Sequence, residues 1–178
     1  MARWISALPE EVTLKGTLSI RNQPDLLEAM YSQEVREGRI DYGIDRFLKE
    51  KVPGDLAWSR VVDPLEKALG RHNFRVVPYE IMKKDGSRYV EEVFWESLPV
   101  DSLASLEIKN ASYSHLAVEI SRVVSPLVTQ EELAEVEKFL SANFSNKTHR
   151  KAEFIGKNAM KEMLQALEDD NREIFKRF

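Results

Sequence analysis

The chain has no cysteine, only three histidines and no glycine-rich loop. Without cysteine it can form no disulfide, no thiolate metal site and no cysteine nucleophile. His72, His115 and His149 are far apart in the sequence, which argues against a zinc site, so we expect no metal. The seven glycines are isolated and do not predict a loop that cradles phosphate groups.

Long apolar runs are also missing. No run approaches the roughly 20 residues that a membrane helix needs, and the first residues lack the apolar stretch of a signal peptide. The 178 residues carry 26 Lys and Arg against 30 Asp and Glu, a net charge of −4, with 43% hydrophobic residues. This composition is typical of globular proteins and argues against a nucleic-acid-binding surface. We therefore expect a single cytoplasmic domain, residues 1–178, that binds neither nucleic acid nor membrane.

Two short segments have the alternation that is typical of β-strands. Between Thr13 and Ile20, apolar residues alternate with polar ones. A central strand of a parallel sheet would be apolar on both faces. We therefore expect an edge strand, or one whose polar face is solvated or covered by polar groups. Asn73–Tyr79 predicts a second short strand that ends at Pro78.

Most of the remaining chain has helical patterns. Pro24 suits the first turn of a helix that Gly38 ends. Further helices are predicted at Ile44–Glu50, after a cap at Asp55 with a kink or restart at Pro64, after a Thr129–Glu132 capping box, and from Met160 to Phe175 packing on the core. The order of strand, helices, strand, helices predicts an α/β fold with a small parallel sheet and a dominant set of helices.

Two groups of basic residues are candidates for anion binding. Arg21 ends the first predicted strand just before a helix, and a guanidinium beside a helix N-terminus favours phosphate. Pairing with a nearby carboxylate such as Asp25 is the alternative. A second basic group, for which a solvated loop is the alternative, consists of Lys147, His149, Arg150 and Lys151.

The stretch LSIRNQPDLLEAMYSQEVREG, from Leu18 to Gly38, resembles the middle of bacterial sulfotransferases. In that family a strand that ends in arginine leads into a helix of the pattern R-x-Q-x-D-x-L-x-S-x-Y-x-Q. Segments that resemble later family features follow in order at Phe47-Leu48, Leu56 to Gly70, Asn73 to Glu80, Asn110 to Ser112 and Asn171 to Phe175. The resemblance spans Val12 to Phe178 and implies the C-terminal part of a sulfotransferase-like, P-loop-type fold.

The resemblance also implies a function, the transfer of a sulfuryl group from 3′-phosphoadenosine 5′-phosphosulfate to a hydroxyl or an amine. Arg21 matches the family arginine that binds the 3′-phosphate. The family serine eight residues later is Ala29 here, and the late R-K-G-x-x-G loop has Ala152 in place of its first glycine. The cofactor-binding residues that the resemblance implies are Arg21, Ser32, Arg150 and Lys151.

The family's P-K-x-G-T-T loop, which binds the 5′-phosphosulfate, and its base have no room before Thr13. Sulfuryl transfer needs donors on the phosphosulfate oxygens and a base. We therefore expect a catalytically incomplete chain that takes a nucleotide or a sulfated glycan, with a protein partner or a second copy completing the fold. The alternatives are a non-catalytic helical protein-interaction module and an enzyme with a new base such as His115 or Glu80.

Overall fold

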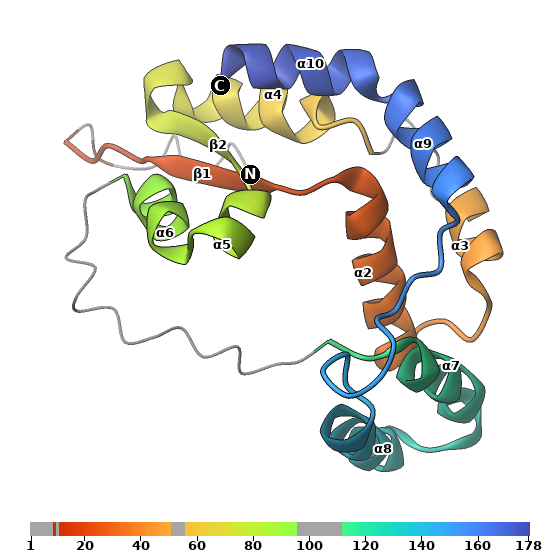
Figure 1. The fold of residues 1–178 in the computed structure, drawn as a ribbon. Helices are drawn as coiled ribbons and strands as arrows, with labels where there is room; N and C mark the ends of the chain where they lie inside the picture. Colours follow the sequence, from red (N-terminus) through yellow and green to blue (C-terminus); the bar gives the residue numbers. More distant parts are fainter. Residues whose placement is uncertain (1–8, 10, 51–55, 96–111) are drawn as a thin grey trace. The chain divides into compact units, whose positions relative to one another are not determined.

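The computed structural model describes residues 9, 11–50, 56–95 and 112–178, which are mostly helical with one two-stranded parallel sheet (Figure 1). The general α/β class that the sequence predicts is therefore confirmed. The described residues divide into two compact units. Unit 1 comes from Met1–Arg21, Pro53–Ala104 and Ala166–Phe178, and unit 2 from Asn22–Val52 and Ser105–Gln165. That residues 1–178 form one domain stays a prediction.

The sheet of unit 1 consists of β1 (Gly16–Ile20) and β2 (Phe74–Pro78). The strands run parallel, with Gly16 beside Phe74 and Ile20 beside Pro78. Both strand predictions are confirmed, although β1 begins at Gly16 rather than at Thr13. Because the sheet has two strands in the described ranges, β1 is an edge strand, as its alternation indicates.

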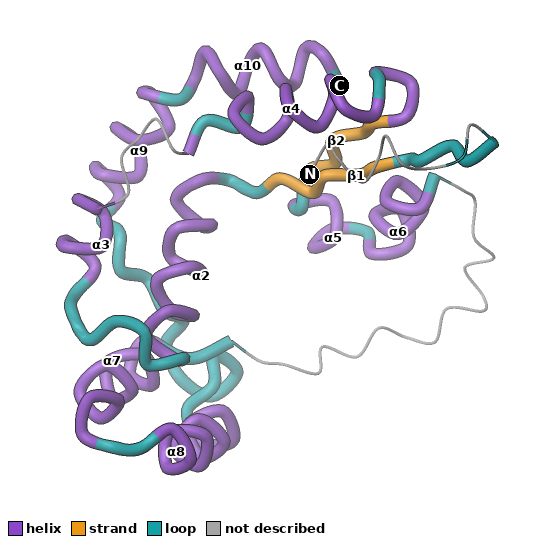
Figure 2. The backbone as a smooth tube through the Cα atoms, turned by 180° about the vertical axis from the view of Figure 1, so that it is seen from behind, coloured by secondary structure: helices purple, strands orange, loops and turns teal. Residues whose placement is uncertain are grey.

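One face of this sheet is apolar and is covered by two helices. Figures 1 and 2 show α4 (Ser59–Leu69) and α10 (Glu168–Arg177) on this side of the strands. Pro64 lies inside α4, which continues through it to Leu69. The buried side chains that form the core here are Ile20, Val62, Phe74, Val76 and Ile174.

The N-terminus of α4 is capped by a side chain that is distant in the sequence. The Asp170 carboxylate accepts hydrogen bonds from the Trp58 N–H at 2.7 Å and from the Ser59 N–H at 3.3 Å. A carboxylate at this position pairs N–H groups that a helix leaves unsatisfied, and the helix dipole favours its charge. Asp55, the cap that the sequence suggests, lies outside the described residues.

We expect Asp170→Ala to lower the free energy of unfolding by about 1–2 kcal/mol, the usual cost of removing a helix cap. Asp170→Asn keeps an acceptor oxygen and should cost less. Asp169→Ala removes the same charge from an exposed neighbour in α10, and its effect should stay within about 0.5 kcal/mol. Urea denaturation measures all three, and equal losses for the two alanine variants would show that Asp170 is not a cap.

The other face of β1 is polar and is covered by α6 (Gly86–Phe94) and the residue after it. Thr17 Oγ1 donates to the Val93 carbonyl and accepts from the Trp95 indole N–H, both at 2.8 Å. Ser19 Oγ accepts from the Tyr89 hydroxyl at 2.8 Å. Figure 2 shows α6 and the preceding α5 (Glu80–Lys84) on the side of the sheet opposite α4 and α10. The expectation that polar groups cover this face is confirmed.

Unit 2 is helical in its described residues. Its helices are α2 (Gln23–Arg36), α3 (Ile44–Glu50), α7 (His115–Val124), the short 3₁₀ helix η4 (Ser125–Leu127), α8 (Gln130–Asn143) and α9 (Lys157–Ala166). The last residue of α9, Ala166, is the first of the C-terminal segment that belongs to unit 1. Pro24 lies in the first turn of α2, and Thr129 with Glu132 forms the predicted capping box of α8. Helices α3 and α7 pack on α2, whose buried residues include Leu27, Tyr31 and Val35.

The prediction of one continuous helix from Met160 to Phe175 is wrong. The chain forms α9 and α10 instead, with a break at Leu167, whose φ of −105° and ψ of 5° are not helical. Glu168, Asp169 and Asp170 follow the break, and three acidic residues favour the N-terminus of a new helix over the middle of an old one. Phe175, expected in the core, is 56% exposed, whereas Ile174 is buried.

Candidate functional site

Arg21 and Tyr79 share the carboxyl edge of the parallel sheet, because Arg21 directly follows β1 and Tyr79 directly follows β2. The Tyr79 N–H donates to the Ile20 carbonyl at 2.7 Å, which extends the pairing beyond the strands. Arg21 Cζ lies 5.4 Å from the centroid of the Tyr79 ring, a cation–π distance. Tyr79 in turn meets the Tyr89 ring edge-on at 6.2 Å. The strands and two aromatic rings therefore position the Arg21 guanidinium.

This edge is suited to an anionic ligand. Ligands of α/β proteins commonly bind beyond the carboxyl ends of parallel strands. The N–H groups of arginine lie in the plane of its guanidinium and match the oxygens of a phosphate in pairs. A cation–π contact uses the face of the guanidinium rather than its edge, so the contact of Arg21 with Tyr79 is compatible with phosphate binding.

The N-terminus of α2, which follows Arg21 in the sequence, already has a cap. The Asn22 side chain accepts a hydrogen bond from the Asp25 N–H at 3.4 Å, and Asp25 adds a negative charge to the first turn. The Asn22 oxygen pairs one N–H group of the first turn, and the Asp25 charge offsets part of the helix dipole, so both reduce the attraction of this helix end for a bound anion. The attraction for an anion therefore falls mainly on Arg21 rather than on the helix.

Ser32, the second residue that the resemblance implies, lies on α2 in unit 2. Its hydroxyl donates to the Glu28 carbonyl one turn earlier, at 2.8 Å. Serine side chains inside helices often bond in this way. To donate to a phosphate, the Ser32 hydroxyl would have to give up this bond.

Arg150 and Lys151 lie in unit 2, between α8 and α9. Lys151 forms an isolated antiparallel bridge with Ser114, and the Arg150 carbonyl accepts from the His115 N–H at 3.0 Å. The Arg150 side chain is 75% exposed and lies 3.8 Å from the Glu153 carboxylate. A solvated basic segment would have this arrangement, and phosphate binding by Arg150 and Lys151 stays a prediction.

Glu28 is a buried residue of unit 2 that the sequence analysis missed. This residue of α2 is 6% exposed, and its Oε1 accepts hydrogen bonds from the Phe154 N–H at 2.7 Å and the Ile155 N–H at 2.9 Å. Glu28 thereby fixes the segment that follows Lys151 to α2. A usable signal was present, because Glu28 falls on the helix face that also carries the apolar Leu27, Tyr31 and Val35.

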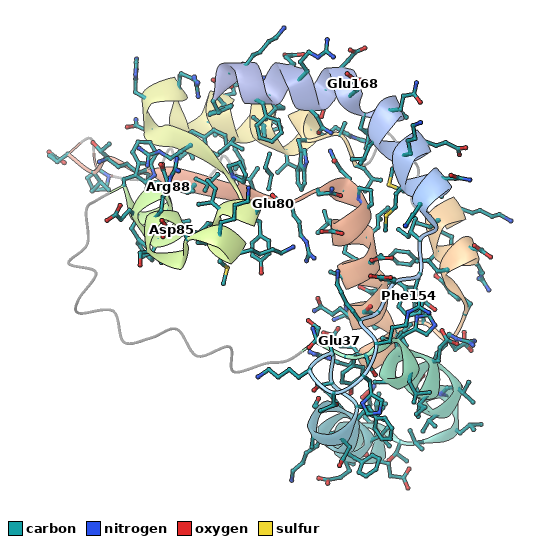
Figure 3. All side chains as sticks on the ribbon, in the orientation of Figure 1. Glu37, Glu80, Asp85, Arg88, Phe154 and Glu168 are labelled. Atoms are coloured by element: carbon teal, nitrogen blue, oxygen red, sulfur yellow. The ribbon has the colours of Figure 1, made fainter. Side chains whose placement is uncertain are left out.

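The two alternative bases belong to different units. The His115 ring of unit 2 stacks on the Phe154 ring at 4.4 Å (Figure 3 labels Phe154). Its Nδ1 is buried and finds no hydrogen-bond partner among the described residues. Proton transfer through this nitrogen would require it to become accessible. Glu80 is the first residue of α5 in unit 1. Asn110, which contributes to the resemblance, lies outside the described residues.

Comparison of the chain with protein-family models, with curated proteins and with solved structures finds no match. In the part of the chain that the structure describes, no three His, Cys, Asp or Glu side chains are grouped to hold a metal ion. Among the helices of the same residues, none is long and apolar enough to cross a membrane. The likeness to sulfotransferases therefore rests on the sequence motifs alone.

Proposed function

We propose that the chain is a sulfotransferase-like domain of partial P-loop type that binds the 3′-phosphate end of 3′-phosphoadenosine 5′-phosphosulfate at Arg21. The observation that carries the proposal is the position of Arg21 at the carboxyl edge of the parallel sheet, in contact with Tyr79. The arginine that it matches in the resembled family has the same role. A cytoplasmic location belongs to this proposal and is in keeping with a chain without cysteine.

The 3′-phosphate offers several charged oxygens to one guanidinium, and such charge-assisted hydrogen bonds are the strong ones in proteins. The contact with Tyr79 supports binding because it restricts the rotamers of a long side chain before the ligand arrives. Ser32, Arg150 and Lys151 are proposed as further cofactor-binding residues. The chain is proposed to be catalytically incomplete on its own, and a sulfated glycan is the other ligand class that it could take.

We expect Arg21→Ala to weaken the binding of 3′,5′-bisphosphoadenosine by about 1.5–3 kcal/mol, the range for a hydrogen bond to a charged group. Arg21→Lys keeps the charge but loses the paired N–H groups, so its affinity should be intermediate. Calorimetric titration of the full chain measures the three affinities.

The matched control is Lys67→Ala, which removes the same charge from an exposed position on α4. Its affinity should stay within about twofold of the unchanged chain, because exposed distant charges are screened. Circular dichroism establishes that the Arg21 variants keep their helices. An Arg21→Ala chain that binds as tightly as the unchanged one would remove Arg21 from the site.

The alternative function is a non-catalytic helical module that holds another protein. One observation favours it, an apolar groove between α7 and α8 of unit 2. Binding at this groove and nucleotide binding at Arg21 involve different residues, so separate titrations distinguish the two functions.

A further inference from the structure

An apolar groove of about 460 Å³ lies between α7 and α8 of unit 2. Glu135 is its one charged lining residue, and Phe139 at its side is 59% exposed. The apolar residues that line it are Ile120, Val124, Val136, Phe139, Leu140 and Phe144. A large aromatic ring left exposed beside an apolar groove is a common feature of protein-binding surfaces.

The apolar surface continues along α7 and η4. Leu116, Val123 and Leu127 are 46%, 56% and 78% exposed. Leu116 and Val123 are seven residues apart, which places them on one face of α7 together with Ile120, and Leu127 follows in η4. The groove is therefore bordered by an apolar stripe about three turns long, which matches the length of a short helix rather than of a small molecule.

The first half of α8 adds negative charge to this surface. Glu132 is held in the capping box, and Glu137 pairs with Arg36 at 3.2 Å. Glu131 and Glu135 are exposed, and neither forms an ion pair with another described residue. Glu135 lines the groove, Glu131 lies one turn before it and the exposed Lys138 one turn after it, so this face of α8 carries two negative charges against one positive charge beside the apolar residues.

We propose that this groove binds an amphipathic helix of another protein, with apolar side chains in the groove and Lys or Arg opposite Glu131 and Glu135. Helices bind apolar grooves through residues spaced three, four and seven apart. A symmetric pair of copies would bring two faces of net negative charge together, so the charge favours a basic partner over a second copy. This inference deepens the alternative function and does not rest on Arg21.

The test uses two synthetic 18-residue amphipathic peptides with leucine on one face, one with lysine and the other with glutamate on the polar face. Fluorescence anisotropy with the full chain should give saturable binding of the lysine peptide, at least about tenfold tighter than that of the glutamate peptide. Phe139→Ala should weaken the binding of the lysine peptide by about tenfold, as expected when a large aromatic contact is removed from an interface.

Charge reversal sharpens the test. Glu135→Lys should lower the affinity for the lysine peptide by about fivefold and raise the affinity for the glutamate peptide. The matched controls lie outside the groove, Phe175→Ala for an exposed ring and Glu162→Lys for net charge, and both should bind as the unchanged chain does. Equal binding of the two peptides, equal effects of Phe139→Ala and Phe175→Ala, or a dimer by sedimentation that Phe139→Ala dissociates would each overturn the proposal.

Discussion

Glu28→Ala is expected to lower the free energy of unfolding by about 3 kcal/mol, since each buried N–H left without a partner costs about 1–3 kcal/mol. Glu28 is 6% exposed, and its carboxylate accepts from the Phe154 and Ile155 N–H groups at 2.7 and 2.9 Å. Alanine leaves both groups without an acceptor and leaves a void between α2 and the segment that precedes α9. Glu28→Gln keeps one acceptor oxygen without the charge, so it should lower the free energy of unfolding by less than Glu28→Ala does.

Urea denaturation measures these losses. Glu34→Ala is the control on the same helix, since Glu34 is partly exposed and pairs with Arg39 at the surface. Its effect should stay below about 1 kcal/mol. Hydrogen exchange localises the change, because the Phe154 and Ile155 amides should exchange faster in Glu28→Ala than in the unchanged chain. Amides that keep their protection, or equal losses for Glu28→Ala and Glu34→Ala, would exclude this role for Glu28.

Tyr31→Ala should lower the free energy of unfolding by about 3–5 kcal/mol, the range for removing a large aromatic ring from a core. Tyr31 is fully buried, and its ring centroid lies 5.5 Å from that of Phe47 and 5.1 Å from that of Phe154. The hydroxyl donates to the Tyr42 carbonyl at 3.2 Å, and burial raises the pKa of Tyr31 above its ordinary value. The ring thus joins α2, α3 and the Phe154 segment in unit 2.

Tyr31→Phe separates the ring from its hydroxyl. This variant should lower the free energy of unfolding by only about 1 kcal/mol, the net value of one hydrogen bond. Phe139→Ala is the control for an exposed ring, with a loss within about 0.5 kcal/mol. The same urea titrations give all three values. A Tyr31→Ala chain that unfolds at the same urea concentration as Tyr31→Phe would mean that the ring does not hold unit 2 together.

Features set by local sequence were predictable. The Thr129–Glu132 capping box, the position of Pro24 in the first turn of α2 and the two strands each depend on residues within a few positions of one another. The polar face of β1 also predicted correctly that polar groups would cover it, although not that α6 would supply them.

Features set by distant residues were not predictable. Asp170 caps α4 across 112 sequence positions, and Glu28 binds Phe154 across 126, so no local pattern identifies which groups pair with these carboxylates. The break at Leu167 also escaped prediction, because the apolar spacing continues across it while the backbone does not. An acidic run can indicate where a helix begins, and a carboxylate on an apolar helix face can indicate a buried hydrogen-bonding group, but neither identifies its distant partner.

The candidate site was partly predictable. The end of a strand directly before a proline-started helix placed Arg21 correctly after β1. Its neighbour Tyr79 was not predicted, because a parallel sheet alone does not specify the register that places Tyr79 beside Arg21. The groove of unit 2 depends on how α7 meets α8, and no motif in the sequence marked it.

The most direct test of the central claim is calorimetric titration of the full chain with 3′,5′-bisphosphoadenosine. The account predicts one saturable site of micromolar affinity that Arg21→Ala weakens at least about tenfold. No heat of binding at millimolar ligand would contradict it, and the peptide titrations at the groove of unit 2 would then become the leading test of function.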